Sequence, residues 1–167
     1  IEACASSNYW SRELKALGHT VRLMPPAYVK PYVKRQKNDA ADAEAICEAV
    51  TRANMRFVET KTPEQQSGLV LHRTRHLFIR QQTAVINAIR SHLGEFGIVA
   101  PVGRNGVEDL LDVVADLNDK RVPEIARACL AALGAQLRKL KEQILEFDRR
   151  IRAWHRSNEM SLRLDDC

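Results

Sequence analysis

Two aspartates one helical turn apart are the residues of this chain best suited to chemistry. Asp39 and Asp42 follow a basic run at 34–37 and open an alanine-rich segment typical of a helix. At this spacing both carboxylates lie on one helix face and repel each other, so a cation is expected to offset them. A divalent metal ion is one candidate, with the basic run holding a polyanion beside it. The alternative is structural: Asn38 or Asp39 caps the helix, and Asp42 is an acid of its first turn.

Other motifs surround this pair in a recognisable order. Glu2 follows an apolar residue and precedes small residues, Tyr9 and Trp10, and the segments 62–66 and 71–75 lie downstream. Taken together, these motifs closely resemble the DEDD transposases of bacterial insertion sequences, the insertion-sequence one-ten family. In that family an acid ends a strand before a small-residue helix that carries Tyr and Trp. A helix with the pattern K-N-D-x-x-D-A then follows, and the pattern is present here at 37–43.

The resemblance implies an RNase-H-like (RuvC-like) catalytic domain with metal-binding acids in the order Asp, Glu, Asp, Asp. Glu2 corresponds to the second acid, Asp39 to the third and Asp42 to the fourth, so all three are expected to be catalytic metal ligands. The first Asp is expected upstream of Ile1, and a further domain with a catalytic serine is expected beyond Cys167. The chain is therefore expected to be a transposase fragment that is inactive alone.

The reaction and partners expected from the resemblance follow the same pattern. An insertion sequence would move by metal-dependent cleavage and joining of DNA strands, with the element's ends and the target DNA as partners. A guide RNA encoded by the element is a further expected partner. Mg²⁺ is the expected ion because the ligands are all oxygens, and a pair of such ions stabilises the attacking and leaving oxygens of phosphoryl transfer.

Composition is compatible with this interpretation but would not have identified it. The net charge of +5 favours polyanionic partners, although such a balance is common in ordinary proteins. No long apolar span or signal peptide is recognisable, which predicts a cytoplasmic bacterial protein without a membrane segment. The cysteines form no C-x-x-C pair and are expected to be free thiols: Cys4, Cys47, Cys129 and Cys167.

Residues 1–60 alternate strand and helix signals. This alternation predicts an α/β layer with a parallel sheet, interpreted as a partial RNase-H-like catalytic domain over 1–60. Strands are expected at 1–3, 19–24 and 55–59, helices at 7–17 and 39–52, and a short helix or turn at 27–33.

Residues 61–158 are expected to form a helical, coiled-coil-like region, and 159–167 the start of the truncated C-terminal transposase domain. A helix with Thr62 as its cap is expected to run towards residue 96, and a shorter one at 107–117. An unbroken apolar seam then steps by three and four through Leu130, Leu133, Leu137, Leu140, Ile144, Phe147, Ile151 and Trp154.

The long helices have two possible pairings, an antiparallel hairpin within the chain or an interface between subunits. Arg75 and Gln82 lie along the apolar stripe of the first helix and would oppose leucines. The intersubunit interface is therefore favoured, and a homo-oligomer is expected to form through Leu133, Leu137, Leu140, Ile144, Phe147 and Ile151.

A second hypothesis is a non-catalytic helical module that oligomerises and binds nucleic acid, and this is the behaviour expected of the fragment alone. Phosphate contacts are expected from Lys34, Arg35, Lys37, Arg73, Arg75 and Arg80. The alternative for the basic face of the long helix is an ordinary solvated surface. Tyr9 and Trp10 could stack on bases, but core packing is favoured for them.

Overall fold

The computed structural model describes residues 1–33 and 38–157, with the side chains of residues 104 and 105 left aside. The chain divides into two compact units, Ile1–Gln66 and Ser67–Cys167. The division lies close to the one expected after residue 60. The segment 159–167, expected to begin a further domain, is outside the described residues.

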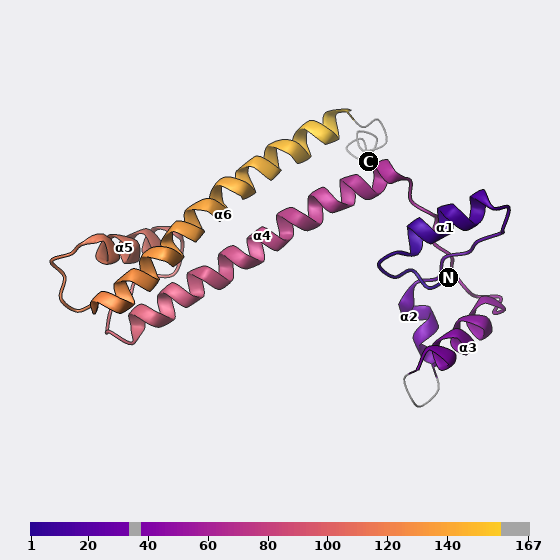
Figure 1. The fold of residues 1–167 in the computed structure, drawn as a ribbon, viewed down its shortest axis with the longest axis horizontal. Helices are drawn as coiled ribbons and strands as arrows, with labels where there is room; N and C mark the ends of the chain where they lie inside the picture. The colour runs from indigo at the N-terminus through magenta and orange to yellow at the C-terminus, as the bar shows by residue number, and fades with distance from the viewer. Residues whose placement is uncertain (34–37, 158–167) are drawn as a thin grey trace. The chain divides into compact units, whose positions relative to one another are not determined.

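Unit 1 is built from short helices (Figure 1). They are α1 (Ser7–Ala16), α2 (Pro26–Val29), the 3-10 turn η1 (Lys30–Tyr32) and α3 (Asp39–Val50). Gly18 follows α1 with φ +87°, a conformation that L side chains rarely adopt, and so ends that helix. Pro26 occupies the first position of α2, where its missing N–H costs nothing. The helices expected at 7–17 and 39–52, and the short helix or turn at 27–33, are confirmed.

The three segments expected to be strands meet only through isolated bridges. Glu2 bridges Met24 in parallel, and Leu23 bridges Val58 in antiparallel orientation. The Met24 amide donates to the Ile1 carbonyl at 2.9 Å. In the described part of the chain no strand extends beyond such a bridge. The parallel orientation predicted for these segments holds for the first pair and is wrong for the second, and the RNase-H-like fold stays a prediction.

The core of unit 1 is small and depends on alanines. Met24 and Val29 are buried against Ala45 and Ala49, which lie one turn apart on α3. Because alanine has only a methyl side chain, α3 can approach α2 and η1 closely. This packing fixes the orientation of the helix that carries Asp39 and Asp42.

The long helices begin with the expected cap. The Gln65 amide donates to Thr62 Oγ1 at 3.2 Å, and the Thr62 amide donates to Gln65 Oε1 at 3.0 Å. This reciprocal pair is a capping box, and it starts α4 (Pro63–Gly94). After α5 (Arg104–Ala115), α6 (Glu124–Ser157) returns antiparallel to α4 (Figure 1).

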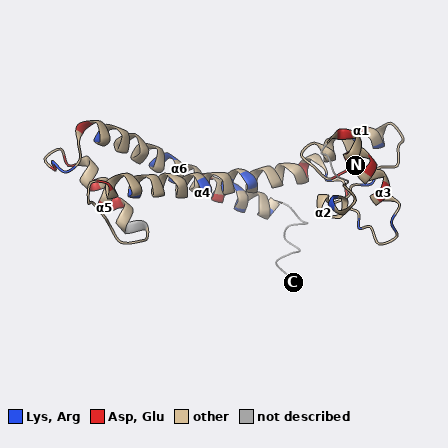
Figure 2. Ribbon diagram, turned by 90° about the horizontal axis from the view of Figure 1, so that it is seen from below, with Lys and Arg blue, Asp and Glu red and all other residues tan. Residues whose placement is uncertain are grey.

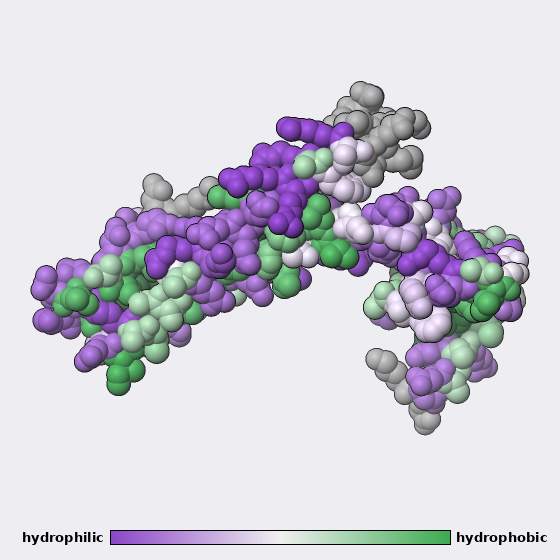
Figure 3. Space-filling model, turned by 45° about the horizontal axis from the view of Figure 1, so that its top comes forward, coloured by the Kyte–Doolittle hydropathy of each residue, from purple (hydrophilic) through white to green (hydrophobic). Residues whose placement is uncertain are grey.

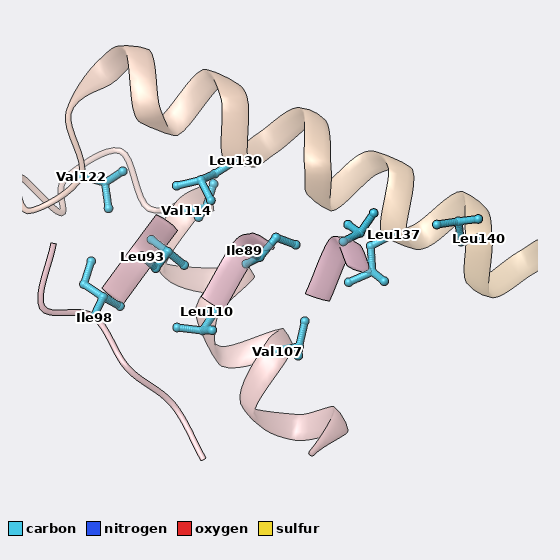
Figure 4. Close-up of a cluster of buried hydrophobic side chains, with 11 residues drawn as sticks. Ile89, Leu93, Ile98, Val107, Leu110, Val114, Val122, Leu130, Leu137 and Leu140 are labelled. Atoms are coloured by element: carbon cyan, nitrogen blue, oxygen red, sulfur yellow. The ribbon is translucent and has the colours of Figure 1, made fainter. Parts of the chain in front are cut away.

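Unit 2 is an α-helical hairpin whose apolar seam is covered within the chain. Leu130, Leu137 and Leu140 of α6 are buried in a cluster with Ile89 and Leu93 of α4 (Figure 4). The remaining seam residues Leu133, Ile144, Phe147 and Ile151 are half-buried. We name the end where α5 packs, residues 81–144, the closed end, and residues 67–80 with 145–157 the open end.

One of the two polar residues on the α4 stripe, Arg75, is paired with an acid of α6. Arg75 forms an ion pair with Asp148 of α6, and Gln82 lines a groove of about 600 Å³ between the helices. Phe78 and Phe147 pack edge to face with ring centroids 5.3 Å apart. Arg75 is therefore not a mismatch in the pairing of α4 with α6, because Asp148, 73 residues away in the sequence, faces it. Self-association through the seam stays a prediction.

Two arginines hold the connections at the closed end. Arg90 donates to the carbonyls of Ala100 (2.9 Å), Pro101 (2.7 Å) and Gly103 (3.2 Å). Arg127 donates to carbonyls at the C-terminal end of α5 and in the turn that follows it: Val113, Val114, Asp116, Asp119 and Val122. The guanidinium groups of these two arginines thus supply hydrogen bonds to backbone carbonyls that have no partner in a regular helix.

The α5–α6 turn also carries a strongly perturbed acid. The side-chain hydrogen bond from Arg121, joined by the Arg121 backbone N–H, lowers the pKa of Asp119 to about 2. Asp119 Oδ1 accepts the Arg121 amide at 3.0 Å, so one carboxylate binds a backbone and a side chain together.

Candidate functional site

The cap of α3 is Asn38. Its Oδ1 accepts a hydrogen bond from the Ala41 amide at 2.8 Å, while Asp39 is the first residue of the helix. The capping alternative is thereby confirmed for Asn38 and not for Asp39. Asp42 lies one turn further on, half-buried, and Asp39 is exposed. Both carboxylates lie in the first turn of α3, where the helix dipole favours negatively charged side chains.

The remaining predicted acid, Glu2, lies half-buried on the segment that bridges Met24. Neither Glu2, Asp39 nor Asp42 forms an ion pair with another residue that the structure describes. Among the described residues, no ion pair therefore explains the presence of these three carboxylates.

The described residues do not form a complete metal site. Within 1–33 and 38–157, no three His, Cys, Asp or Glu side chains lie close enough together to hold a metal ion. The expected convergence of Glu2 with Asp39 and Asp42 into one ligand group is therefore not present. The segment of Glu2 is joined to Met24 by an isolated bridge. The carboxylate oxygens suit Mg²⁺ chemically, but these three acids as arranged do not suffice to bind it.

Unit 1 contains a hollow of about 490 Å³ that none of the three acids lines. It is lined by Ile1, Leu14, His19, Thr20, Val21, Arg22 and Val50. None of these residues carries a carboxylate, so the hollow offers no metal-ligand set of its own.

Polar contacts join α1 to the segment that leads into α4. Ser11 is fully buried, and its hydroxyl lies 2.6 Å from the Thr60 hydroxyl. The Arg12 guanidinium donates to the Lys61 carbonyl at 2.8 Å, and Asn8 Oδ1 accepts the Lys61 amide at 2.8 Å. This polar face of α1 was not identified from sequence, because isolated Ser, Asn and Arg residues have no distinctive spacing.

Tyr9 and Trp10 are not core residues. Their exposed fractions are 51% and 53%, and their rings meet edge to face with centroids 5.2 Å apart. The packing role favoured for them from sequence is wrong within this chain.

The predicted phosphate-binding residues differ in their availability. Arg73 and Arg80 are exposed on α4, whereas Arg75 is half-buried in its ion pair with Asp148. Arg75 is therefore less available to a phosphate than Arg73 and Arg80, and the phosphate contacts expected of all three stay predictions. Lys34, Arg35 and Lys37 lie outside the described residues.

The cysteines in the described part of the chain agree with the sequence prediction of free thiols. Cys4, Cys47 and Cys129 are free and exposed, and Cys167 lies outside the described residues. None of the helices that the structure describes is long and apolar enough to cross a membrane.

Comparison with known proteins yields relatives over nearly the whole chain. A family model described as "Transposase", for DEDD enzymes of the IS110 type, matches residues 2–98. The chain is 47% identical to a "Putative transposase y4pF/y4sB" of Sinorhizobium fredii, over 98% of the chain and 42% of that protein. It is 44% identical to a "Probable family 20 transposase" of Pseudomonas aeruginosa, over 99% of the chain and 47% of that protein.

A third relative shows the same extent of coverage. The chain is 36% identical to a "Transposase for insertion sequence element IS1328" of Yersinia enterocolitica, over 98% of the chain and 48% of that protein. The chain thus spans less than half the length of these curated relatives. No solved structure matches it.

Proposed function

Because this chain belongs to the DEDD transposases of IS110-type insertion sequences, we propose that it supplies acids of the catalytic site of a transposase that cuts and joins DNA strands. The observation that carries the proposal is the Asn38 cap. Asn38 performs the structural task at the start of α3, which leaves the Asp39 and Asp42 carboxylates available for chemistry.

The proposed cofactor is a divalent cation, most simply Mg²⁺, since all the proposed ligands are carboxylate oxygens. Asp39 and Asp42 would supply two ligands from one helix face, and Glu2 is the proposed third. A complete site requires an acid beyond those that the structure brings together. The relatives are more than twice as long as the aligned region and have the room to supply one.

The proposed partners follow from the same family membership. DNA at the ends of the element and at the target is the proposed substrate, with a guide RNA as a further proposed partner. The exposed Arg73 and Arg80 support phosphate binding on α4. Self-association is proposed to bring several catalytic sites onto one DNA assembly.

The test uses a transposase as long as the relatives and compares the two aspartates with the neighbouring Asn38. Asp39→Asn and Asp42→Asn should abolish strand cleavage and leave thermal stability near that of the parent. Asn38→Ala should do the opposite, lowering stability by about 1 kcal/mol through loss of the cap while cleavage persists. If Asp39→Asn destabilises the fold and spares cleavage, Asp39 is structural and the proposal fails.

A second candidate function is a non-catalytic nucleic-acid-binding module, favoured by the self-contained hairpin of unit 2. Its core is buried without a second chain, and residues 67–157 carry a net charge of +5. Under this alternative, none of the acid variants would change the activity of the longer protein.

A further inference from the structure

The net positive charge of unit 2 lies at one end of the hairpin. Residues 67–80 carry three arginines and no acid, and residues 145–157 carry four arginines and two acids, which gives the open end a net charge of +5. The closed end, residues 81–144, carries eight basic and eight acidic residues and is neutral. In Figure 2 the acidic segments of unit 2 gather around α5 and the adjoining turns. Helix pairing therefore concentrates the charge in a way that the linear sequence does not show.

The two acids of the open end are already neutralised. Asp148 pairs with Arg75, and Glu146 pairs with Arg150 at 2.9 Å and Arg149 at 3.7 Å. The hydrogen bond from Arg150 lowers the pKa of the Glu146 carboxyl below its usual range, so this acid stays ionised. Exposed arginines without an ion pair to any described residue remain: Arg73, Arg80, Arg152 and Arg156.

These arginines are arranged in rows along the helices. Arg149, Arg152 and Arg156 are spaced i, i+3, i+7, which places them on one face of α6 over about 10 Å of its axis. Arg73, His76 and Arg80 repeat the same spacing on α4, and all three are exposed. A single DNA strand presents about three phosphates over about 10 Å of helix axis. Figure 3 shows strongly hydrophilic surface over the C-terminal part of α6.

The two rows belong to one folded element. The Trp154 ring packs against His72 with centroids 6.4 Å apart, and its Cζ2 atom lies 2.6 Å from where a Cβ on Gly68 would be. Gly68 thus permits the close approach that brings the last turns of α6 to the start of unit 2. The arginines of both rows are consequently carried by two packed helices and not by a loop.

We propose that the open end of the hairpin, through Arg73, Arg80, Arg149, Arg150, Arg152 and Arg156, binds the phosphate backbone of double-helical DNA without sequence preference. The surface offers positive charges and no described acid that is left unpaired, and contacts from such charges to phosphates carry no sequence information. Such a surface positions a duplex and does not select its sequence. The choice of DNA as the polyanion rests on the proposed function.

The test measures binding of the chain to a labelled DNA duplex of arbitrary sequence by fluorescence anisotropy, over a series of salt concentrations. The triple variant Arg80→Gln, Arg152→Gln, Arg156→Gln should weaken binding at least about tenfold at about 0.1 M salt. The slope of log affinity against log salt should become shallower by about 2 to 3, since each phosphate contact contributes about 0.9.

A matched control removes equal charge from the closed end. Lys120, Arg138 and Lys139 are exposed there, and their replacement by Gln should change the affinity by less than about twofold. Replacement of Arg80, Arg152 and Arg156 by Lys should retain most of the slope, which excludes loss of folding as the cause. Thermal unfolding of every variant gives an independent check of folding.

Several results would overturn the proposal. Equal losses in the two Gln triples would mean that only net charge matters. A loss confined to a structured RNA of similar length, with duplex binding unchanged, would assign the surface to RNA. Absence of duplex binding at low salt would also refute it. Asp39→Asn with Asp42→Asn should leave binding intact, so failure of the catalytic proposal is distinguishable from failure of this one.

Discussion

Replacement of Arg127 by Met tests whether one side chain organises the connection between α5 and α6. Arg127 Nη1 donates to the carbonyls of Val113 (3.0 Å), Val114 (2.7 Å) and Asp116 (2.7 Å). Arg127 Nη2 donates to those of Asp119 and Val122. Val113 and Val114 belong to the last turn of α5, whose carbonyls have no intrahelical partner.

The expected cost follows from the donors available. The two terminal nitrogens carry four protons, so at most four of these hydrogen bonds can be well formed at one time. A hydrogen bond to a charged group contributes about 1.5 to 3 kcal/mol when buried, and Arg127 is half-exposed, so about 1 kcal/mol each is appropriate. Met keeps the apolar stem in place. The free energy of unfolding should therefore fall by roughly 3 to 4 kcal/mol.

Urea denaturation followed by circular dichroism measures this change. Arg138→Met is the control, because Arg138 is an exposed arginine of the same helix, and it should stay within about 0.5 kcal/mol of the parent. Arg127→Lys should recover less than half of the loss, since a single ammonium cannot reach both groups of carbonyls. Amides at 116–123 should exchange faster with solvent in Arg127→Met. A loss below about 1 kcal/mol would refute the assigned role.

Three further predictions concern the hairpin. Gly106→Ala should lower the free energy of unfolding by about 1 to 3 kcal/mol despite the better helix propensity of alanine, because the new Cβ would lie 2.0 Å from the Pro101 carbonyl oxygen. In the same thermal melts Gly134→Ala should be neutral or stabilising, because the atom nearest to its new Cβ is a leucine methyl at 2.9 Å. Asp119, whose pKa is about 2, contributes stability that is present above about pH 4 and is lost as the pH falls towards 2, so Asp119→Asn should flatten acid unfolding in that window. Leu140→Asp should lower the free energy of unfolding by more than about 3 kcal/mol, because the Leu140 side chain is only 4% exposed within one chain. If light scattering shows instead that the variant converts a dimer into folded monomers, the seam is a subunit interface.

The helices were predictable because their signals are local. Thr62 and Gln65 are three residues apart and form the capping box directly, and Gly18 ends α1 through its own backbone conformation. The seam of α6 repeats over enough turns to exceed any accidental pattern. Asn38 as the cap of α3 was one of two residues that the sequence allowed.

Features that depend on a distant partner were not predictable. Arg75 is a mismatch in the sequence pattern but has an acid opposite it in the fold, separated by 73 residues. The carbonyl contacts of Arg90 and Arg127 likewise have no sequence signature. The segments at 1–3 and 55–59 are too short for alternation to specify the orientation of their neighbours.

Of the candidate site, the sequence supplies only the acids, and their catalytic role stays a prediction. The identity of Glu2, Asp39 and Asp42 came from motif resemblance, and the family match over residues 2–98 includes all three. Their mutual geometry depends on how the bridged segments pair, which local sequence does not determine. The exposure of Tyr9 and Trp10 was missed for a related reason, since an aromatic residue on a helix gives no indication of what covers it.

The antiparallel course of α4 and α6 also implies an order of folding. Leu93 of α4 and Leu130 of α6 share one buried cluster and are 37 residues apart, whereas Arg75 and Asp148 are 73 residues apart. Direct closure of the longer loop costs only about 0.6 kcal/mol more. Once the shorter loop has closed, however, each further helical turn can pair with almost no additional loss of loop entropy. The hairpin should therefore zip from its closed end, and its last turns, where arginines repel one another, should be the last to pair and the first to fray. A polyanion at that end would reduce the repulsion and complete the zipper, so that the final step of folding and the binding of DNA would be one event.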